Sequence, residues 1–216
     1  MYRTFALVLT LMTATFGIFV AEAAEPVSIA RAPAPGPVVL PDALMQRSVQ
    51  DGATVLRIDG IITATLEHRL AEALASTPSA SPVVVELSSP GGLTAAGYRI
   101  IDRILAERRA GRSIATRVRA GEACESMCVG VYLAGYPRYA APNAVFMVHA
   151  PRMAENGHMT VRSTQAMVER LVSLGASTRW IERVRGAGGF SGARDYRETA
   201  SDLSAEGSGI VTHLLR

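Results

Sequence analysis

Short β-branched runs alternate with segments of helical periodicity along most of this chain. One run, at residues 82–87, ends in Ser-Ser-Pro-Gly-Gly, and residues 93–110 then place apolar side chains on one helical face. An earlier β-branched run at 54–58 precedes Leu66, Leu70 and Leu74, whose spacing of four residues is typical of one face of a helix. This alternation favours an α/β domain in which helices cover a largely parallel sheet.

The second half of the chain continues the alternation. Strands are predicted at 113–118, 144–148 and 210–214, and helices at 124–133 and 160–184. The last of these is long and amphipathic, and the glycine-rich stretch 186–192 follows it. The pattern shows no internal repeat, so we expect one domain, at residues 46–216.

The first 45 residues have a different character. Arg3 precedes an apolar stretch at 5–20, and Ala21-Glu22-Ala23 has the small-x-small pattern of a cleavage site. We therefore expect a signal peptide at 1–23, with a transmembrane anchor as the alternative reading. A proline-rich leader at 24–45 follows, and the mature protein is expected to be periplasmic or secreted, without membrane contact.

All 22 basic residues are arginines, because the chain contains no lysine. The formal net charge is only +3, and the arginines between 99 and 119 are typical of helical surfaces. We therefore expect no nucleic-acid partner.

Ser126 and His149 are the candidate catalytic pair. A serine hydroxyl is a weak nucleophile until a neighbouring base takes its proton, and His149 ends an apolar run 23 residues after Ser126. Taken singly, each has a structural alternative, namely a helical serine bonded to its own turn and a buried, hydrogen-bonded histidine.

Two further sequence features bear on a site around this pair. Gly91-Gly92 follows a predicted strand, where backbone N–H groups could stabilise an oxyanion, although a tight turn explains the glycines equally well. Cys124 and Cys128 lie four residues apart, at a spacing typical of no zinc site. On one helix face their Cα atoms would be about 6 Å apart, so we expect a disulfide, with two buried thiols as the alternative.

Four motifs in this order resemble the proteolytic subunit of Clp protease and its exported relatives, which have the ClpP/crotonase fold. They are Ser88-Ser89-Pro90-Gly91-Gly92, Glu125-Ser126-Met127-Cys128, the segment 143–151 and the segment 203–211. The resemblance implies a βαβ superhelical fold with a largely parallel sheet flanked by helices. It also implies that Ser126 is the nucleophile, His149 the base, and Gly92 and Met127 the oxyanion donors.

The resemblance leaves the third catalytic residue open. The family's aspartate position corresponds to Ala200, and Asp202 is the nearest acid, so Asp202 is our candidate orienter of His149. Asp195, Glu198, a backbone carbonyl or water are the alternatives, and a helix cap is the structural reading of Asp202. A Ser–Lys dyad is excluded, since the chain has no lysine.

These inferences predict an exported serine hydrolase, specifically a peptidase, that acts on peptide or protein substrates without a cofactor or metal. In the resembling family the long helix mediates oligomer contacts, which implies a homo-oligomer. The alternative function is a non-catalytic peptide-binding or assembly module of the same fold, which the missing aspartate motivates.

Overall fold

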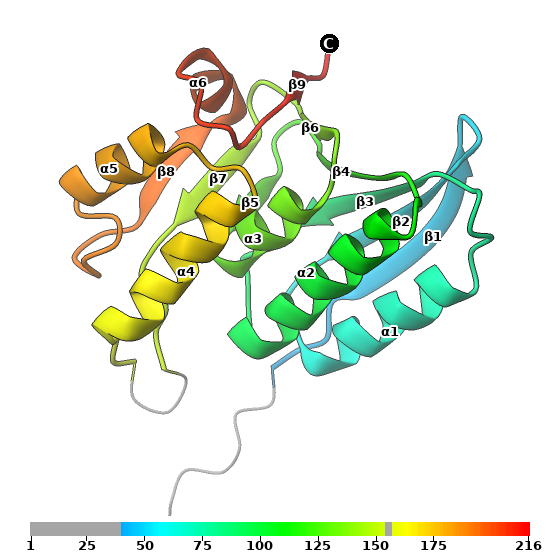
Figure 1. Cartoon of the computed structure of the whole chain (residues 1–216), viewed down its shortest axis with the longest axis horizontal. Helices are drawn as coiled ribbons and strands as arrows, with labels where there is room; N and C mark the ends of the chain where they lie inside the picture. Colours follow the sequence, from blue (N-terminus) through cyan, green and yellow to red (C-terminus); the bar gives the residue numbers. More distant parts are fainter. Residues whose placement is uncertain (1–39, 154–156) are drawn as a thin grey trace, which may run out of the picture. The chain divides into compact units, whose positions relative to one another are not determined.

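The computed structural model describes residues 40–153 and 157–216, and Figure 1 shows how their helices and strands are arranged. The expected signal peptide and most of the proline-rich leader lie outside the described residues. The first strand begins at Leu44, two residues before the expected start of the domain, and Ala43 is already buried.

A six-stranded sheet forms the larger layer. Its order is β1-β2-β3-β4-β6-β9, and every neighbouring pair is parallel except β1 with β2. The strands are β1 Leu44–Gln50, β2 Ala53–Asp59, β3 Val83–Ser88, β4 Ile114–Val118, β6 Arg138–Ala140 and β9 His213–Leu214. The mostly parallel sheet confirms the predicted α/β class.

Helices cover one face of this sheet (Figure 1). They are α1 Ala64–Ala75, α2 Thr94–Arg109 and α3 Met127–Ala134. On the covered face, Leu56 of β2 lies opposite Val85 of β3, and both are fully buried in the hydrophobic core. Because strand side chains alternate between faces, the β-branched run of β3 delivers every second residue to this core.

The opposite face of the sheet carries charges. Glu86 of β3 is buried and lies between Arg57 of β2 and Arg117 of β4 in the strand register. Arg57 forms ion pairs with Glu86 at 3.1 Å and with Glu122 at 2.6 Å. Hydrogen bonds with Glu122 and then Glu86 raise the pKa of the Arg57 guanidinium, although burial opposes them. A buried carboxylate is tolerated here because arginines surround it.

A second, three-stranded sheet supports the residues around the candidate site. It has the order β5-β7-β8, with strands Ala123–Glu125, Val145–Val148 and Tyr196–Thr199. β5 and β7 are parallel, and β8 is antiparallel to β7. Sequence patterns predicted no strand at β1, β6 or β8 and placed part of β5 in a helix. β5, β6 and β8 are too short for a clear alternation of side chains.

The predicted helix at 160–184 is wrong in one respect, since it is two helices. They are α4 Val161–Ser173 and α5 Thr178–Gly186. Gly175 has a φ of 111°, which ends α4, and the Ser177 side chain caps α5 by accepting a hydrogen bond from the Trp180 amide. A final short helix, α6, spans Ala200–Ala205. Among the residues that the structure describes, no helix has the length and apolar content to cross a membrane.

Candidate active site

Ser126 occupies the turn between β5 and α3. The sequence predicted that a helix already begins at Cys124, but residues 123–125 pair with β7 as a strand, and the helix begins at Met127. Ser126 itself has a φ of 55° and a ψ of −122°, a conformation that side-chain-bearing residues rarely adopt. Its amide donates to the Met147 carbonyl at 2.7 Å. A strained serine between a strand and a helix is the arrangement of a nucleophile elbow.

The predicted disulfide between Cys124 and Cys128 is present in the structure and brackets Ser126. The two residues do not share a helix face, because Cys124 lies in β5 and Cys128 in α3. Their Cα atoms are 5.2 Å apart and both side chains are fully buried. The bond therefore ties the strand before the serine to the helix after it.

The two glycines have different contacts. Ile62 forms a parallel bridge with Gly92, in which its amide donates to the Gly91 carbonyl and its carbonyl accepts from the Leu93 amide, each at 2.8 Å. In such a bridge the N–H of the central residue points away from the partner strand. The N–H of Gly92 therefore points away from Ile62.

Gly91 lies against the turn between β5 and α3 that contains Ser126. A Cβ atom on Gly91 would lie 2.8 Å from Ser126 Cβ and 2.8 Å from the Glu125 carbonyl oxygen. The loop after β3 therefore lies against Ser126 because residue 91 has no side chain.

Met127 is the first residue of α3. Its amide has no partner within the helix, because the first turn of a helix lacks preceding carbonyls. The positive end of the helix dipole also lies here. Gly92 and Met127 line the same cavity as Ser126, so their N–H groups remain the candidate donors to a developing oxyanion.

His149 follows the end of β7 and is half-buried. Its Nδ1 lies 2.7 Å from the carbonyl oxygen of Ala150. A carbonyl can only accept, so Nδ1 carries a proton, and in the neutral imidazole the lone pair is then on Nε2.

Asp202 lies in the first turn of α6 and is exposed. Its carboxylate accepts a hydrogen bond from the Thr199 hydroxyl at 2.6 Å, and its amide donates to the same hydroxyl. Thr199, not Asp202, is the N-cap. Ala200, at the family's aspartate position, is fully buried. The structure does not bring Asp202 into the cavity described next.

The two alternative acids have partners of their own. Glu198 accepts hydrogen bonds from Trp180 and Arg183. Asp195 lies 4.0 Å from Arg152 and 3.7 Å from Arg197.

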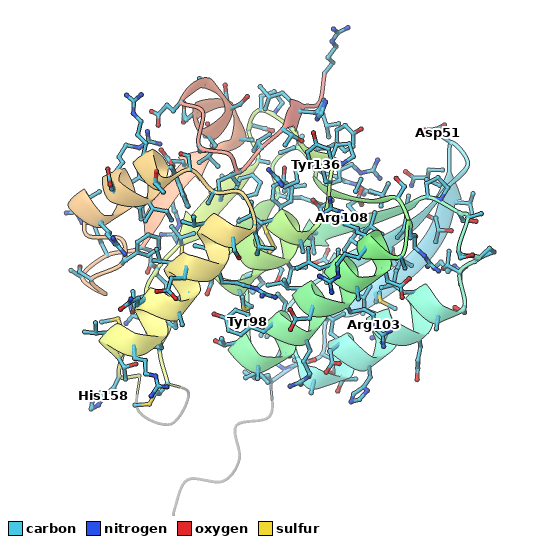
Figure 2. The ribbon with its side chains drawn as sticks, in the orientation of Figure 1. Asp51, Tyr98, Arg103, Arg108, Tyr136 and His158 are labelled. Carbon is cyan, nitrogen blue, oxygen red and sulfur yellow. A yellow bond between two sulfur atoms is a disulfide. The ribbon has the colours of Figure 1, made fainter. Side chains whose placement is uncertain are left out.

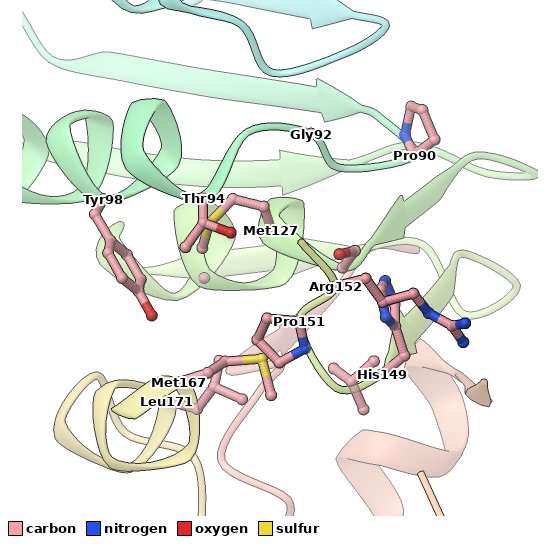
Figure 3. A pocket seen from close by; sticks show the side chains of 13 residues that line it. Pro90, Gly92, Thr94, Tyr98, Met127, His149, Pro151, Arg152, Met167 and Leu171 are labelled. Carbon is pink, nitrogen blue, oxygen red and sulfur yellow. The ribbon is translucent and has the colours of Figure 1, made fainter. Parts of the chain in front are cut away.

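The other predicted catalytic residues and the oxyanion donors line one cavity of about 250 Å³ (Figure 3). Its lining includes Gly92, Ser126, Met127 and His149. The sequence analysis missed its other walls, which come from α2, α4 and the segment after His149: Thr94, Tyr98, Pro151, Arg152, Met167 and Leu171. No local motif marks the residues of α2 and α4, since helix packing alone brings them to the cavity, whereas Pro151 and Arg152 lie close to His149 in the chain.

The polarity of the cavity lining differs between its two ends. In Figure 3, Tyr98, Met167 and Leu171 lie on one side, and Arg152 and His149 lie on the other. Tyr98 projects from α2 (Figure 2), and burial raises the pKa of its phenol. The cavity therefore offers an apolar end and a charged end around the same serine.

The chain matches the model of one protein family, described as Clp protease, over residues 55–175. This span covers more than half of the chain and includes Gly92, Ser126, Met127 and His149, whereas Asp202 lies beyond it. A comparison with curated proteins found no match.

Proposed function

Because the chain belongs to the Clp protease family, we propose that it is a serine peptidase in which Ser126 is the nucleophile and His149 the general base. Family membership supports a peptidase-type activity. The assignment of roles rests chiefly on one observation, the strained turn of Ser126 in the same cavity as His149.

The proposed reaction assigns a step to each of these groups. Ser126 Oγ bonds to the substrate carbonyl carbon while its proton passes to His149 Nε2. The carbonyl oxygen becomes an oxyanion that accepts from the N–H groups of Gly92 and Met127, each contributing about 3 kcal/mol. The C–N bond then breaks as Nε2 returns the proton to the leaving amine, and water hydrolyses the acyl-enzyme by the same steps.

The Ala150 carbonyl serves as the orienter of His149 in this proposal. Its contact with Nδ1 at 2.7 Å selects the tautomer that an aspartate selects in other serine hydrolases. A neutral carbonyl stabilises the imidazolium less than a carboxylate does, so we expect slower acylation than in a full triad.

We further propose that the peptidase is exported and acts in the periplasm or outside the cell. The disulfide around Ser126 supports this, because disulfides persist in oxidising compartments. Members of the family handle peptide substrates and typically form oligomers. We propose the same for this chain, and the exposed Val161 on α4 supports an interface on that helix.

A fluorophosphonate probe tests the enzymatic proposal. The wild type should become labelled at Ser126, and Ser126→Ala should abolish labelling while keeping the wild-type melting temperature. His149→Ala should slow labelling by about 10⁴-fold. Folded wild-type protein that takes up no probe would instead support the alternative, a non-catalytic peptide-binding or assembly module.

A further inference from the structure

Arg152 is a charged residue of the cavity lining that the proposed reaction does not use. It follows His149 by three residues and lines the same cavity as Ser126. Apart from the ionisable His149, no other described residue in the lining carries a charge at neutral pH, and none is an acid. The cavity is therefore positive at this end.

Among the residues that the structure describes, the guanidinium of Arg152 has only a loose ion pair. The one carboxylate within 4.0 Å among the described residues is that of Asp195, and this distance is longer than a hydrogen bond. Asp195 is also shared with Arg197, at 3.7 Å. The Arg152 side chain remains 47% exposed, so its N–H donors are available to a ligand.

The position of Arg152 indicates which part of a substrate it would meet. A general base that protonates the leaving amine must lie on the leaving-group side of the scissile bond. His149 is that base in the proposed function. Arg152 comes from the same segment, and in Figure 3 it lies on the His149 side of the cavity, away from Tyr98.

We propose that Arg152 is a specificity-determining residue that binds a carboxylate on the leaving-group side of the substrate. This inference rests on the proposed peptidase function and adds a substrate class to it. Guanidinium groups bind carboxylates through two parallel hydrogen bonds, which gives both affinity and orientation. The carboxylate can belong to an Asp or Glu side chain or to the C-terminus of a short peptide.

Matched quenched-fluorescence peptides test the proposal. One pair differs only by Glu or Gln in the residues after the cleaved bond, and a second pair ends in a free acid or an amide. We expect kcat/KM to be about tenfold higher for the acidic member of at least one pair. The pair that shows the preference identifies the source of the carboxylate, and equal rates in both pairs would overturn the proposal.

Variants assign the preference to Arg152. In Arg152→Gln the acid-to-neutral ratio should fall to about 1, and in Arg152→Glu a Lys peptide should become the better substrate. Asp195→Asn should raise the ratio, because it removes the described carboxylate that lies within 4.0 Å of Arg152.

Arg179→Gln is the matched control, since Arg179 is exposed on α5 and outside the cavity lining. If Arg152→Gln keeps the wild-type acid-to-neutral ratio, Arg152 is not the source of the preference. Both rates in the ratio are measured on the same variant, so a general loss of activity does not change it.

A binding measurement separates this inference from the proposed function. In Ser126→Ala, fluorescence anisotropy of the same labelled peptides should show about tenfold tighter binding of the acidic member, lost on adding Arg152→Gln. That result would hold even if the wild type cleaves nothing. Equal Kd values for acidic and neutral peptides would overturn carboxylate recognition, whatever the outcome of the fluorophosphonate test.

Discussion

His149 places its Nδ1 2.7 Å from the carbonyl oxygen of Ala150, the next residue in the chain. The contact is local, so it needs no acid from a distant segment to set the tautomer of the imidazole. In the proposed function, this contact would let Nε2 act as the base although alanine occupies the family's aspartate position.

Asp202→Asn should leave the rate of acylation within about threefold of the wild type, as expected for an exposed polar residue outside the cavity. Thr199→Ala should lower the free energy of unfolding by about 1 kcal/mol, because it removes the N-cap of α6. Labelling rates and urea denaturation measure the two effects. If Asp202 orients His149 after all, Asp202→Asn should slow acylation by about 10⁴-fold.

Gly91→Ala should slow acylation by about 100-fold or more, since its Cβ would displace the turn that holds Ser126. Gly111→Ala is its matched control, because both glycines have a φ of 95° but a Cβ on Gly111 meets nothing within 4 Å. Both variants should lose about 1–2 kcal/mol of stability through backbone strain, which thermal melts measure. Equal labelling in the two variants would show that the loop of Gly91 does not position Ser126.

The double variant Cys124→Ala/Cys128→Ala should lose about 2 kcal/mol of stability and acylate more slowly than the wild type. The bond joins the strand and the helix on either side of Ser126, so its loss frees the turn. Intact mass after alkylation of unreduced, denatured wild type should show no reactive thiols. Finding two alkylated thiols there would contradict the disulfide.

Glu86→Gln should lower the free energy of unfolding by about 3 kcal/mol, because it leaves the surrounding arginines without their buried carboxylate. Asp59→Asn is the control at the exposed end of the same network, where an ion pair contributes less than about 1 kcal/mol. Chemical denaturation at neutral pH compares them. A similar small loss in both variants would mean that Glu86 contributes no more than a surface charge.

The mature protein should begin at Ala24, after the Ala21-x-Ala23 pattern. N-terminal mass analysis of protein recovered from outside the cytoplasm measures this directly. If the protein in a membrane fraction still begins at Met1, the signal peptide is not removed and the protein is membrane-anchored.

Much of the site could be predicted from local sequence. The histidine and the paired glycines end or follow an apolar run, so their place at the edge of a sheet follows from the alternation of strands and helices. Ser126 was instead predicted near the start of a helix, and the structure places it just before α3. Cys124 and Cys128 are only four residues apart, so their pairing could be predicted from the sequence, although the turn between β5 and α3, and not a shared helix face, brings them together. The elements were harder to place where they are short, as with β5, which was predicted as helix.

The α/β class, the candidate nucleophile and base, and the exclusion of a lysine base could all be inferred from the sequence, because they depend on local periodicity and on which residues are present. The packing of distant segments was needed to see that Asp202 lies in the first turn of α6, capped by Thr199, and outside the cavity that Ser126 shares with Arg152. Proximity between distant segments depends on strand register and helix packing, and no local pattern encodes either.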